Sequence, residues 1–229
     1  MDTDALERPV LAVDVVVFRM HNGVLQVLLV KRPKYPFRGS LALPGVAVQV
    51  DETLEAAAKR AIRKKIQGLS EKAQNAIHLE QLAAFDALYR DPRGRTVSVA
   101  YLGVTSTQEE HPPENLWVDV TENSPGVLPF DHNLMIKTAV TRLRGKLRYT
   151  DIVKALLPET FRFDELINIY ETVLGASVNL TNFRTRLRKL GFIKRVRVLT
   201  EAVGKQGGRP PHVYRFTHDS IQTVERDFL

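Results

Sequence analysis

Basic and hydrogen-bonding residues gather on one face of a predicted helix in the last third of the chain. In the segment NLTNFRTRLRKLGFI, Phe183, Leu187 and Leu190 recur at i, i+4 and i+7, which predicts a helix with this face inward. The outward face and its flanks then carry Thr181, Asn182, Arg184, Thr185, Arg186, Arg188 and Lys189. Arg can bind the O6 and N7 atoms of guanine, Asn can bind adenine, and further cations can hold phosphates. The chemistry predicted is recognition of double-stranded DNA.

A basic, glycine-rich segment follows that helix. Between Thr181 and Arg215 the sequence has ten Lys and Arg residues and one acid, Glu201. The segment KQGGRPPH contains Lys205, Arg209 and His212, which could reach a minor groove or flanking phosphates. An ordinary hairpin loop is the alternative interpretation of this segment.

The elements that must position these residues predict a winged helix-turn-helix domain over residues 149–229. We expect a short helix after Thr150 or Asp151, a helix over 164–174 closed by Gly175, and the basic helix. Two strand-like runs, KRVRVLTEAV and HVYRF, flank the turn GKQGGRPP. Helices followed by a basic hairpin are typical of a winged helix.

The first part of the chain, residues 1–148, predicts an α+β domain with a mixed sheet. Residues 10–18 and 25–31 are β-branched runs joined by a turn that ends in Asn-Gly, which favours a hairpin. A short apolar strand and a helix in DETLEAAAKRAIRKKI follow, with Asp51 or Thr53 as its cap. Strands are expected at 79–87, at 95–105 and around Trp117, and then a helix over 131–145.

Composition excludes several classes of protein. The 229 residues contain no Cys, so a disulfide scaffold, a thiolate metal site and a Cys nucleophile are excluded, and we expect a cytoplasmic protein. The beginning MDTDALERPV lacks the basic start and apolar run of a signal peptide, and no apolar run is long enough to span a membrane. The net charge of +7 lies mainly after residue 144, where 15 Lys and Arg residues stand against nine acids.

The segments LLVKRPKYPFRGSLALPG and DETLEAAAKRAIRKKIQGL together resemble the signature of the Nudix domain. Gly45 matches its first glycine, Asp51 or Glu52 the next acid, Arg60 its arginine, Ile62 an apolar position, and Gly68-Leu69 its end after one extra residue. The positions that match the three metal-binding glutamates are Ala61, Lys64 and Lys65. Nudix hydrolysis needs carboxylates to hold Mg²⁺ or Mn²⁺, so the resemblance implies a domain with no metal site and no catalytic residue.

A degenerate Nudix domain followed by a basic winged helix resembles the Nudix-related transcriptional regulators of NAD metabolism, the NrtR family. The resemblance extends over nearly the whole chain and includes LQVLLVKR, RDPRGRTVSVAY, PFDHNLMI and GRPPHVYRF. It implies a homodimeric repressor of NAD biosynthesis or salvage genes that binds a pseudo-palindromic operator. A two-fold dimer would place its recognition helices roughly 34 Å apart on such DNA. The implied effector is ADP-ribose or a related NAD-derived nucleotide, with no cofactor.

The resemblance also implies a ligand site in the first domain. Its candidate residues are Arg32, Phe37, Arg38, Arg90, Arg93, Arg95, Asp131 and His132. Guanidinium groups suit a pyrophosphate. Phe37 or Tyr35 would stack on an adenine, whereas an aromatic residue beside Pro also suits loop packing. His132 would touch a ribose, although His132 and Asp131 equally suit the start of a helix.

Two other functions remain open at this point. Val46 stands where a second glycine is common, and one extra residue precedes Gly68, so the effector could be a sugar or another nucleotide. An active Nudix pyrophosphatase would need acids such as Glu52 or Glu55 as non-standard metal ligands. A purely structural interaction module is disfavoured by the charge asymmetry.

Overall fold

The chain divides into two compact units. The computed structural model describes residues 8–66, 68–108, 115–121, 125–198 and 212–224. One unit comprises Met1–Arg19 and Gln26–Ala139, and the other comprises Met20–Leu25 and Val140–Leu229. No helix among the described residues is long and apolar enough to cross a membrane.

A seven-stranded mixed sheet forms the centre of the first unit. Its strands are β1 (Val10–His21), β2 (Val24–Lys31), β3 (Leu41–Ala42), β4 (Gly45–Ala47), β5 (His78–Phe85), β6 (Thr96–Val104) and β7 (Asn115–Asp119). The order is β3-β2-β1-β6-β5, with β4 paired to β1 and β7 paired to β2. Strands β1 and β6 run parallel, whereas the β2–β3, β2–β7, β1–β4 and β5–β6 pairs are antiparallel. The expected mixed sheet is confirmed.

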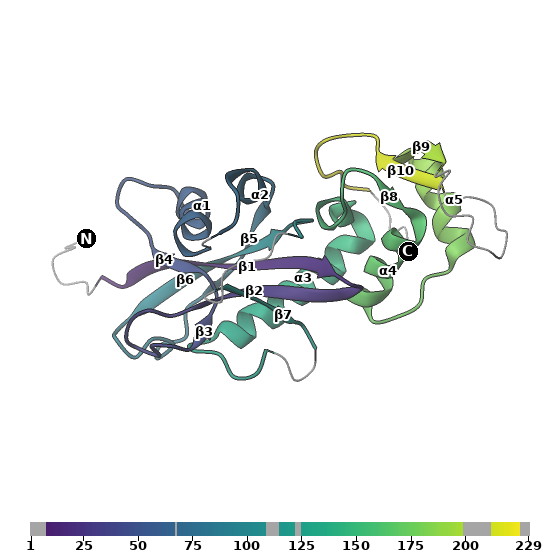
Figure 1. Ribbon diagram of the computed structural model, residues 1–229. Coiled ribbons are helices and arrows are strands. Elements are labelled where there is room, and N and C mark those ends of the chain that lie inside the picture. The colour runs from purple at the N-terminus through teal and green to yellow at the C-terminus, as the bar shows by residue number, and fades with distance from the viewer. Residues whose placement is uncertain (1–7, 67, 109–114, 122–124, 199–211, 225–229) are drawn as a thin grey trace. The chain divides into compact units, whose positions relative to one another are not determined.

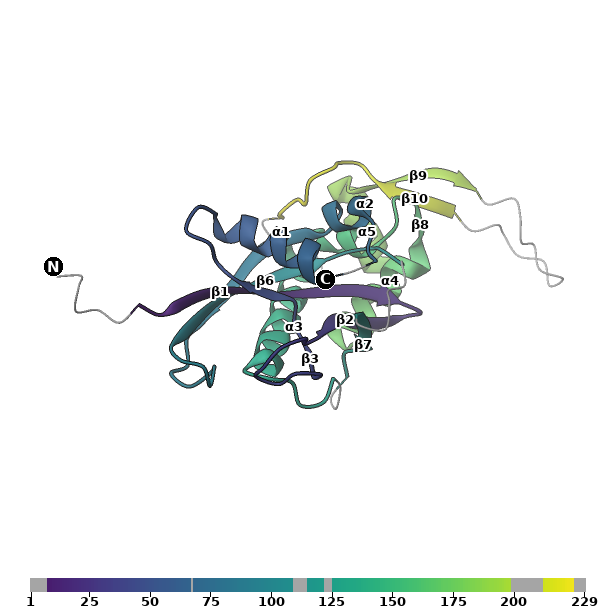
Figure 2. The ribbon, with the colours of Figure 1, turned by 60° about the vertical axis from the view of Figure 1, so that its left-hand side comes forward.

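Helices cover both faces of this sheet (Figures 1 and 2). Helices α1 (Leu54–Lys65) and α2 (Glu71–Asn75) lie on one face, and α3 (His132–Tyr149) begins on the other. Thr53, one of the two expected caps, accepts a hydrogen bond from the backbone N of Ala56 at 3.2 Å. The inner face of α1 packs its alanines and Ile62 against Val13, Val15 and Val17 of β1. Because side chains alternate along a strand, Asp14 faces the opposite side of the sheet.

The second unit contains the expected winged helix. Its elements are the 3₁₀ helix η2 (Ile152–Leu156), β8 (Phe161–Arg162), α4 (Phe163–Leu174), α5 (Leu180–Leu190), β9 (Ile193–Val198) and β10 (His212–Phe216). The strands form a sheet in the order β8-β10-β9. Gly175 ends α4 in the left-handed conformation, with φ of 70°, which glycine adopts without a steric penalty. Residues 175–179 are therefore the turn of the helix-turn-helix.

Aromatic side chains join the helices of this unit. The Tyr170 ring meets the edge of Phe183 with centroids 4.7 Å apart, and Phe163 lies 6.3 Å from the same ring. Phe183 and Leu187 are buried as expected, whereas Leu190, expected inward, is 39% exposed. Leu190 is the last residue of α5, and Gly191 turns the chain there with φ of 65°.

Candidate ligand site and nucleic-acid interface

Two phenylalanines and two arginines form a cluster in the first unit, which we call the arginine–phenylalanine cluster. The Phe37 and Phe130 rings meet edge to face, with centroids 5.1 Å apart. The guanidinium of Arg32 lies 4.8 Å from the centre of the Phe130 ring, and that of Arg93 lies 6.0 Å from it. Phe37 and Phe130 have φ of 61° and 58°, a region that bulky residues seldom adopt. Backbone strain of this kind is concentrated at ligand sites.

The charges of this cluster favour an anion. The half-buried Arg32 forms no ion pair with any residue that the structure describes, and its Nε donates to the carbonyl of Pro36 at 2.9 Å. Arg93 pairs with Asp91, with Nε–Oδ1 and Nη2–Oδ2 distances of 3.0 and 2.6 Å. Burial and the neighbouring Arg93 guanidinium both lower the pKa of Arg32. A bound phosphate would offset this repulsion.

A buried ionic network adjoins the cluster. Arg90 donates two hydrogen bonds to Asp131, at 2.8 and 2.6 Å, and its Nη2 lies 3.6 Å from Asp14. Ser98 donates to the same oxygen of Asp14, with its Oγ 2.7 Å from Oδ2. Buried charges are tolerated when they are paired in this way. The network therefore fixes β1, β6 and the beginning of α3 to one another.

His132 belongs to this network and is neutral at neutral pH. Its Nδ1 accepts a hydrogen bond from the backbone N of Leu43 at 3.1 Å, so Nε2 carries the proton and faces Asp14 at 3.7 Å. Burial lowers the pKa of His132, although the charges of Asp14 and Asp131 oppose this shift. The imidazole lies 5.2 Å from the Phe130 ring, which connects the network to the arginine–phenylalanine cluster.

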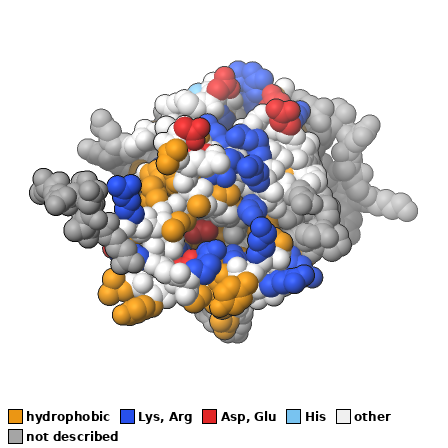
Figure 3. Space-filling view, turned by 90° about the vertical axis from the view of Figure 1, so that its left-hand side faces the viewer, with side chains coloured by type: hydrophobic (Ala, Val, Ile, Leu, Met, Phe, Trp, Pro, Cys, Tyr) orange, Lys and Arg blue, Asp and Glu red, His pale blue; other side chains and the backbone are white. Residues whose placement is uncertain are grey.

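The remaining candidates for the ligand site lie apart from this network. Arg38 is exposed, and Arg95 donates to the carbonyl of Asp86 at 2.7 Å, which closes the loop between β5 and β6. On the face of the molecule where β1 begins, Lys and Arg side chains are prominent between hydrophobic ones (Figure 3). The structure thus brings Arg32, Phe37 and Arg93 into one cluster and Arg90, Asp131 and His132 into the network beside it.

The retained acid and arginine of the motif stabilise the loop before α1. Glu52 accepts hydrogen bonds from Arg60 Nε at 2.9 Å and from the backbone N of Gln49 at 2.8 Å. Arg60 also donates to the carbonyl of Ala47 in β4, at 2.7 Å. The hydrogen bond from Arg60 is the largest cause that lowers the pKa of Glu52 to about 2. Glu52 is therefore already engaged by protein donors.

The positions that match the metal-binding glutamates carry no ligand for a metal. Ala61 is fully buried, Lys64 is exposed and Lys65 is half-buried. Within the part of the chain that the structure describes, no group of three or more His, Cys, Asp or Glu residues could hold a metal ion. Ammonium groups would repel Mg²⁺ or Mn²⁺ at this place.

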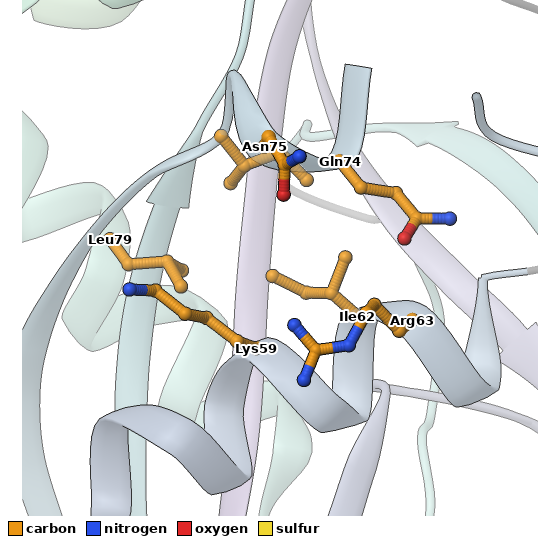
Figure 4. Close-up of a pocket in the computed structure, with 7 residues that line it drawn as sticks. Lys59, Ile62, Arg63, Gln74, Asn75 and Leu79 are labelled. Atoms are coloured by element: carbon orange, nitrogen blue, oxygen red, sulfur yellow. The ribbon is translucent and has the colours of Figure 1, made fainter. Parts of the chain in front are cut away.

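A groove of about 160 Å³ lies between α1, α2 and the beginning of β5 (Figure 4). Lys59 and Arg63 line it together with Ile62, Gln74, Asn75, Ile77 and Leu79. Ligand sites for small molecules are usually about 300–1,000 Å³. This groove is therefore too small for a dinucleotide, and Lys59 is already paired with Glu55 at 2.6 Å.

Helix α5 presents the basic face that its sequence predicts. Thr181, Asn182, Arg184, Thr185, Arg186 and Lys189 are exposed, while the side chain of Arg188 lies outside the described part. Asn179 Oδ1 accepts from the backbone N of Asn182 at 3.0 Å and so caps the beginning of the helix. The guanidinium of Arg184 lies 4.4 Å from the centre of the Phe163 ring, and Thr185 donates to the carbonyl of Thr181 at 2.9 Å.

The hairpin after α5 is described only at its base. His212 begins β10, is half-buried and pairs with Val198 of β9. Lys205 and Arg209 lie outside the described residues, so their expected contacts with DNA remain predictions.

Sequence reasoning missed three residues of the candidate ligand site and the network beside it: Asp14, Ser98 and Phe130. Asp14 does carry a signal, because it is a single carboxylate inside the apolar run VLAVDVVVF, and a buried acid needs a partner. The partners, Ser98 and Arg90, are far away in the sequence, so no local pattern identifies them.

Two family models match the chain. The NUDIX domain matches residues 8–138, and the NrtR DNA-binding winged helix domain matches residues 153–216. The chain is 34% identical to the ADPR responsive transcriptional repressor NtrR of Acinetobacter baylyi over 215 residues, which are 91% of this chain and 82% of that protein.

Solved structures of Shewanella oneidensis NrtR are similar to the present one. The structure of that protein has a TM-score of 0.79 and 28% identity, covering 95% of this chain and 99% of that chain. Its complex with a 27mer DNA has a TM-score of 0.76 and 27% identity, covering 95% and 98%. Its NUDIX domain with ADP ribose has a TM-score of 0.53 and 31% identity, covering 62% and 94%.

Proposed function

The chain belongs to the NrtR family, which combines a Nudix domain with a winged-helix DNA-binding domain, and we propose that it is an ADP-ribose-responsive transcriptional repressor. Residues 149–229 bind an operator, and residues 1–148 bind the effector. The observation that carries this proposal is the exposed polar and basic face of α5 behind the turn at Gly175. The relatives with DNA and with ADP ribose support both halves of it.

The proposed complex uses α5 in the major groove of a pseudo-palindromic operator, bound by a homodimer in the cytoplasm. The base and phosphate contacts come from the exposed face of α5, which carries Thr181, Asn182, Arg184, Thr185, Arg186, Arg188 and Lys189. The hairpin after α5 extends these contacts along the DNA through Lys205, Arg209 and His212. The regulated genes are those of NAD biosynthesis or salvage. ADP-ribose releases the DNA only if it binds the DNA-free form more tightly than the DNA-bound form.

The proposed effector site is the arginine–phenylalanine cluster together with Arg38 and Arg95. Arg32 and Arg93 bind phosphate oxygens, and the exposed ring of Phe37 stacks on the adenine. Arg90, Asp131 and His132 hold this surface in place from the buried network. The protein needs no cofactor and is not a hydrolase in this proposal, since Glu52 is engaged by Arg60.

A mobility-shift titration on the DNA upstream of the protein's own gene, at two salt concentrations and with or without ADP-ribose, tests the proposal. We expect specific binding that ADP-ribose releases and that weakens with salt. Arg184→Ala should weaken specific binding by about 1–3 kcal/mol if it reads a base. The control Lys72→Ala also removes one positive charge, at an exposed position of α2 in the first unit, and should leave DNA binding unchanged.

Each failure of this experiment has a distinct meaning. Specific DNA binding that ADP-ribose does not change would support the DNA-binding regulator and exclude ADP-ribose as its effector. A thermal-shift panel of NAD, NMN, ATP and pentoses would then identify the effector. Equal affinity of the wild type and Arg184→Ala would count against the role of Arg184. Release of AMP from ADP-ribose with Mg²⁺ would replace the repressor with an enzyme.

A further inference from the structure

The tip of the β1–β2 hairpin folds with the second unit. Met20–Leu25 belong to that unit, whereas the rest of β1 and β2 belongs to the first. Asn22 and Gly23 turn the chain with φ of 49° and 79°, as in the tight turn that Asn-Gly favours. Thr172 of α4 donates its hydroxyl to the carbonyl of Gly23 at 3.0 Å. A Cβ at Gly23 would lie 3.0 Å from the amide nitrogen of Asn168, so a glycine also allows this close approach of α4.

Helix α3 contacts the same part of α4 within the second unit. This helix passes from the first unit to the second between Ala139 and Val140. Arg144 Nε of α3 donates to the carbonyl of Val173 at 2.7 Å. A carbonyl in the last turn of a helix has no partner within that helix, so a guanidinium is a suitable donor. The hairpin and α3 therefore hold two adjacent residues, Thr172 and Val173.

The residue before these two, Glu171, is bonded to the turn that leads into α5. Its Oε1 accepts a hydrogen bond from the backbone N of Val178 at 3.0 Å. The next residue, Asn179, caps the beginning of α5. We call residues 171–173 the α4 end. The recognition helix is thus fixed to the α4 end, and the hairpin tip and α3 hold the α4 end in place.

Both elements that hold the α4 end begin in the buried network of the first unit. Strand β1 carries Asp14, and α3 begins at His132, directly after Asp131. The His132 ring lies 5.2 Å from Phe130 of the arginine–phenylalanine cluster. From this network, β1 continues as one strand to His21 and α3 as one helix to Tyr149. Rigid elements and hydrogen-bond networks of this kind can carry energetic coupling between distant sites.

We propose that the β1–β2 hairpin and α3 carry the response to ADP-ribose from the effector site to α5, with Thr172 and Arg144 as positioning residues. This inference rests on the proposed function, because it explains how the proposed effector acts on the proposed DNA-binding helix. A shift of the network moves the hairpin tip and α3, the α4 end follows them, and Glu171 moves the beginning of α5. ADP-ribose releases the DNA because it favours the arrangement in which α5 no longer fits the major groove.

A mobility-shift titration of the full-length protein on the DNA upstream of its own gene, with and without saturating ADP-ribose, tests this inference. The ratio of the two dissociation constants for DNA is the release factor of a variant, so an equal change in both constants leaves it unaltered. One hydrogen bond changes an equilibrium constant by a factor of about 2–12, and Thr172→Val should lower the release factor by this amount. The double variant Thr172→Val/Arg144→Met should lower it further. Thr172→Ser keeps the hydroxyl and should restore the release factor of the wild type.

Thr138→Val is the matched control for Thr172→Val. The Thr138 hydroxyl also belongs to a half-buried helical residue, but it donates to the carbonyl of Leu134 in its own helix, at 2.8 Å. The release factor of Thr138→Val should stay within about twofold of the wild-type value, since the substituted site shares no partner with the α4 end. The Tm of Thr138→Val and of Thr172→Val should fall by similar small amounts, because each loses one hydrogen bond of a hydroxyl.

Calorimetric titration with ADP-ribose separates this coupling from binding of the effector. Without DNA, every variant should bind ADP-ribose within about twofold of the wild type, because the substitutions lie outside the effector site. In the wild type, bound DNA should weaken ADP-ribose binding by the release factor, since coupling between two sites is reciprocal.

Three results would count against these assignments. A wild-type release factor in the double variant would overturn the inference, and so would equal release factors of Thr172→Val and Thr172→Ser. Specific DNA binding by the wild type that ADP-ribose does not change would overturn the effector proposal as well.

Discussion

Replacing Gly45 by Ala should destabilise the first unit through the buried network. A Cβ at this position would lie 2.0 Å from Asp14 Oδ1 and 3.1 Å from the carbonyl oxygen of Val13. The first distance is far below van der Waals contact, so the Asp14 carboxylate must move. Moving it disturbs the hydrogen bond from Ser98 at 2.7 Å and the approach of Arg90 at 3.6 Å. Overpacking and the loss of a hydrogen bond to a charged group together predict a cost of about 2–4 kcal/mol.

Urea unfolding measured by circular dichroism and by the fluorescence of the single Trp, Trp117, gives this cost. Trp117 lies in β7 of the first unit, so its fluorescence reports on the unit that contains Gly45. Gly145→Ala is the control and is followed by circular dichroism, because Gly145 lies in the part of α3 that belongs to the second unit and nothing is within 4 Å of its added Cβ. That variant should be more stable by about 0.5–1 kcal/mol, since Ala favours the helix. Neutral surface substitutions change the free energy of unfolding by up to about 0.5 kcal/mol. A free energy of unfolding for Gly45→Ala that differs from the wild-type value by less than about 0.5 kcal/mol would refute the reasoning.

Two more predictions concern the loop before α1 and the aromatic surface. Because Arg60 lowers the pKa of Glu52 from 4.5 to about 2, the ionised carboxylate stabilises the fold above pH 4.5, and this stability is lost as the pH falls toward 2. Glu52→Gln should therefore lower the Tm at pH 7 and reduce the fall in Tm between pH 4.5 and about 2. Plots of Tm against pH that run parallel for the variant and the wild type would contradict this prediction. Phe37→Ala should raise the dissociation constant of ADP-ribose about tenfold by removing a stacking surface. The control Tyr35→Ala removes a ring that is 79% exposed, and an equal loss in both variants would exclude a specific role for Phe37.

Local patterns predicted most elements of the fold. The Asn-Gly turn, the spacing of apolar residues in α5 and Gly175 at the end of α4 are each signals within a few residues. Helix α2 has five residues and β4 has three, which is too short for a period to be visible. The parallel pairing of β1 with β6 joins strands far apart in the sequence, so no turn signal specifies it.

The candidate ligand site was predictable by residue type and not by contact. The sequence identifies arginines and Phe37 near the motif, but Arg90 and Asp131 are 41 residues apart and Asp14 and Ser98 are 84 apart. Only the tertiary fold brings Arg90 next to Asp131, with which it forms an ion pair. Arg32 has no carboxylate partner among the described residues. This difference gives Arg90 a structural role and leaves Arg32 as the candidate for binding an anion.

The motif of the first unit combines residues that are needed for the fold with residues that are needed for metal chemistry, and the structure separates the two groups. Gly45 is required by the close approach of Asp14, and Glu52 and Arg60 are required by the loop before α1. These three residues would be retained in a protein that never hydrolyses a nucleotide. Weaker ADP-ribose binding after Glu52→Gln would therefore be evidence about the loop and not about catalysis. Evidence on catalysis must come from positions Ala61, Lys64 and Lys65, where a buried methyl group and two ammonium groups stand in place of carboxylates that could hold a metal.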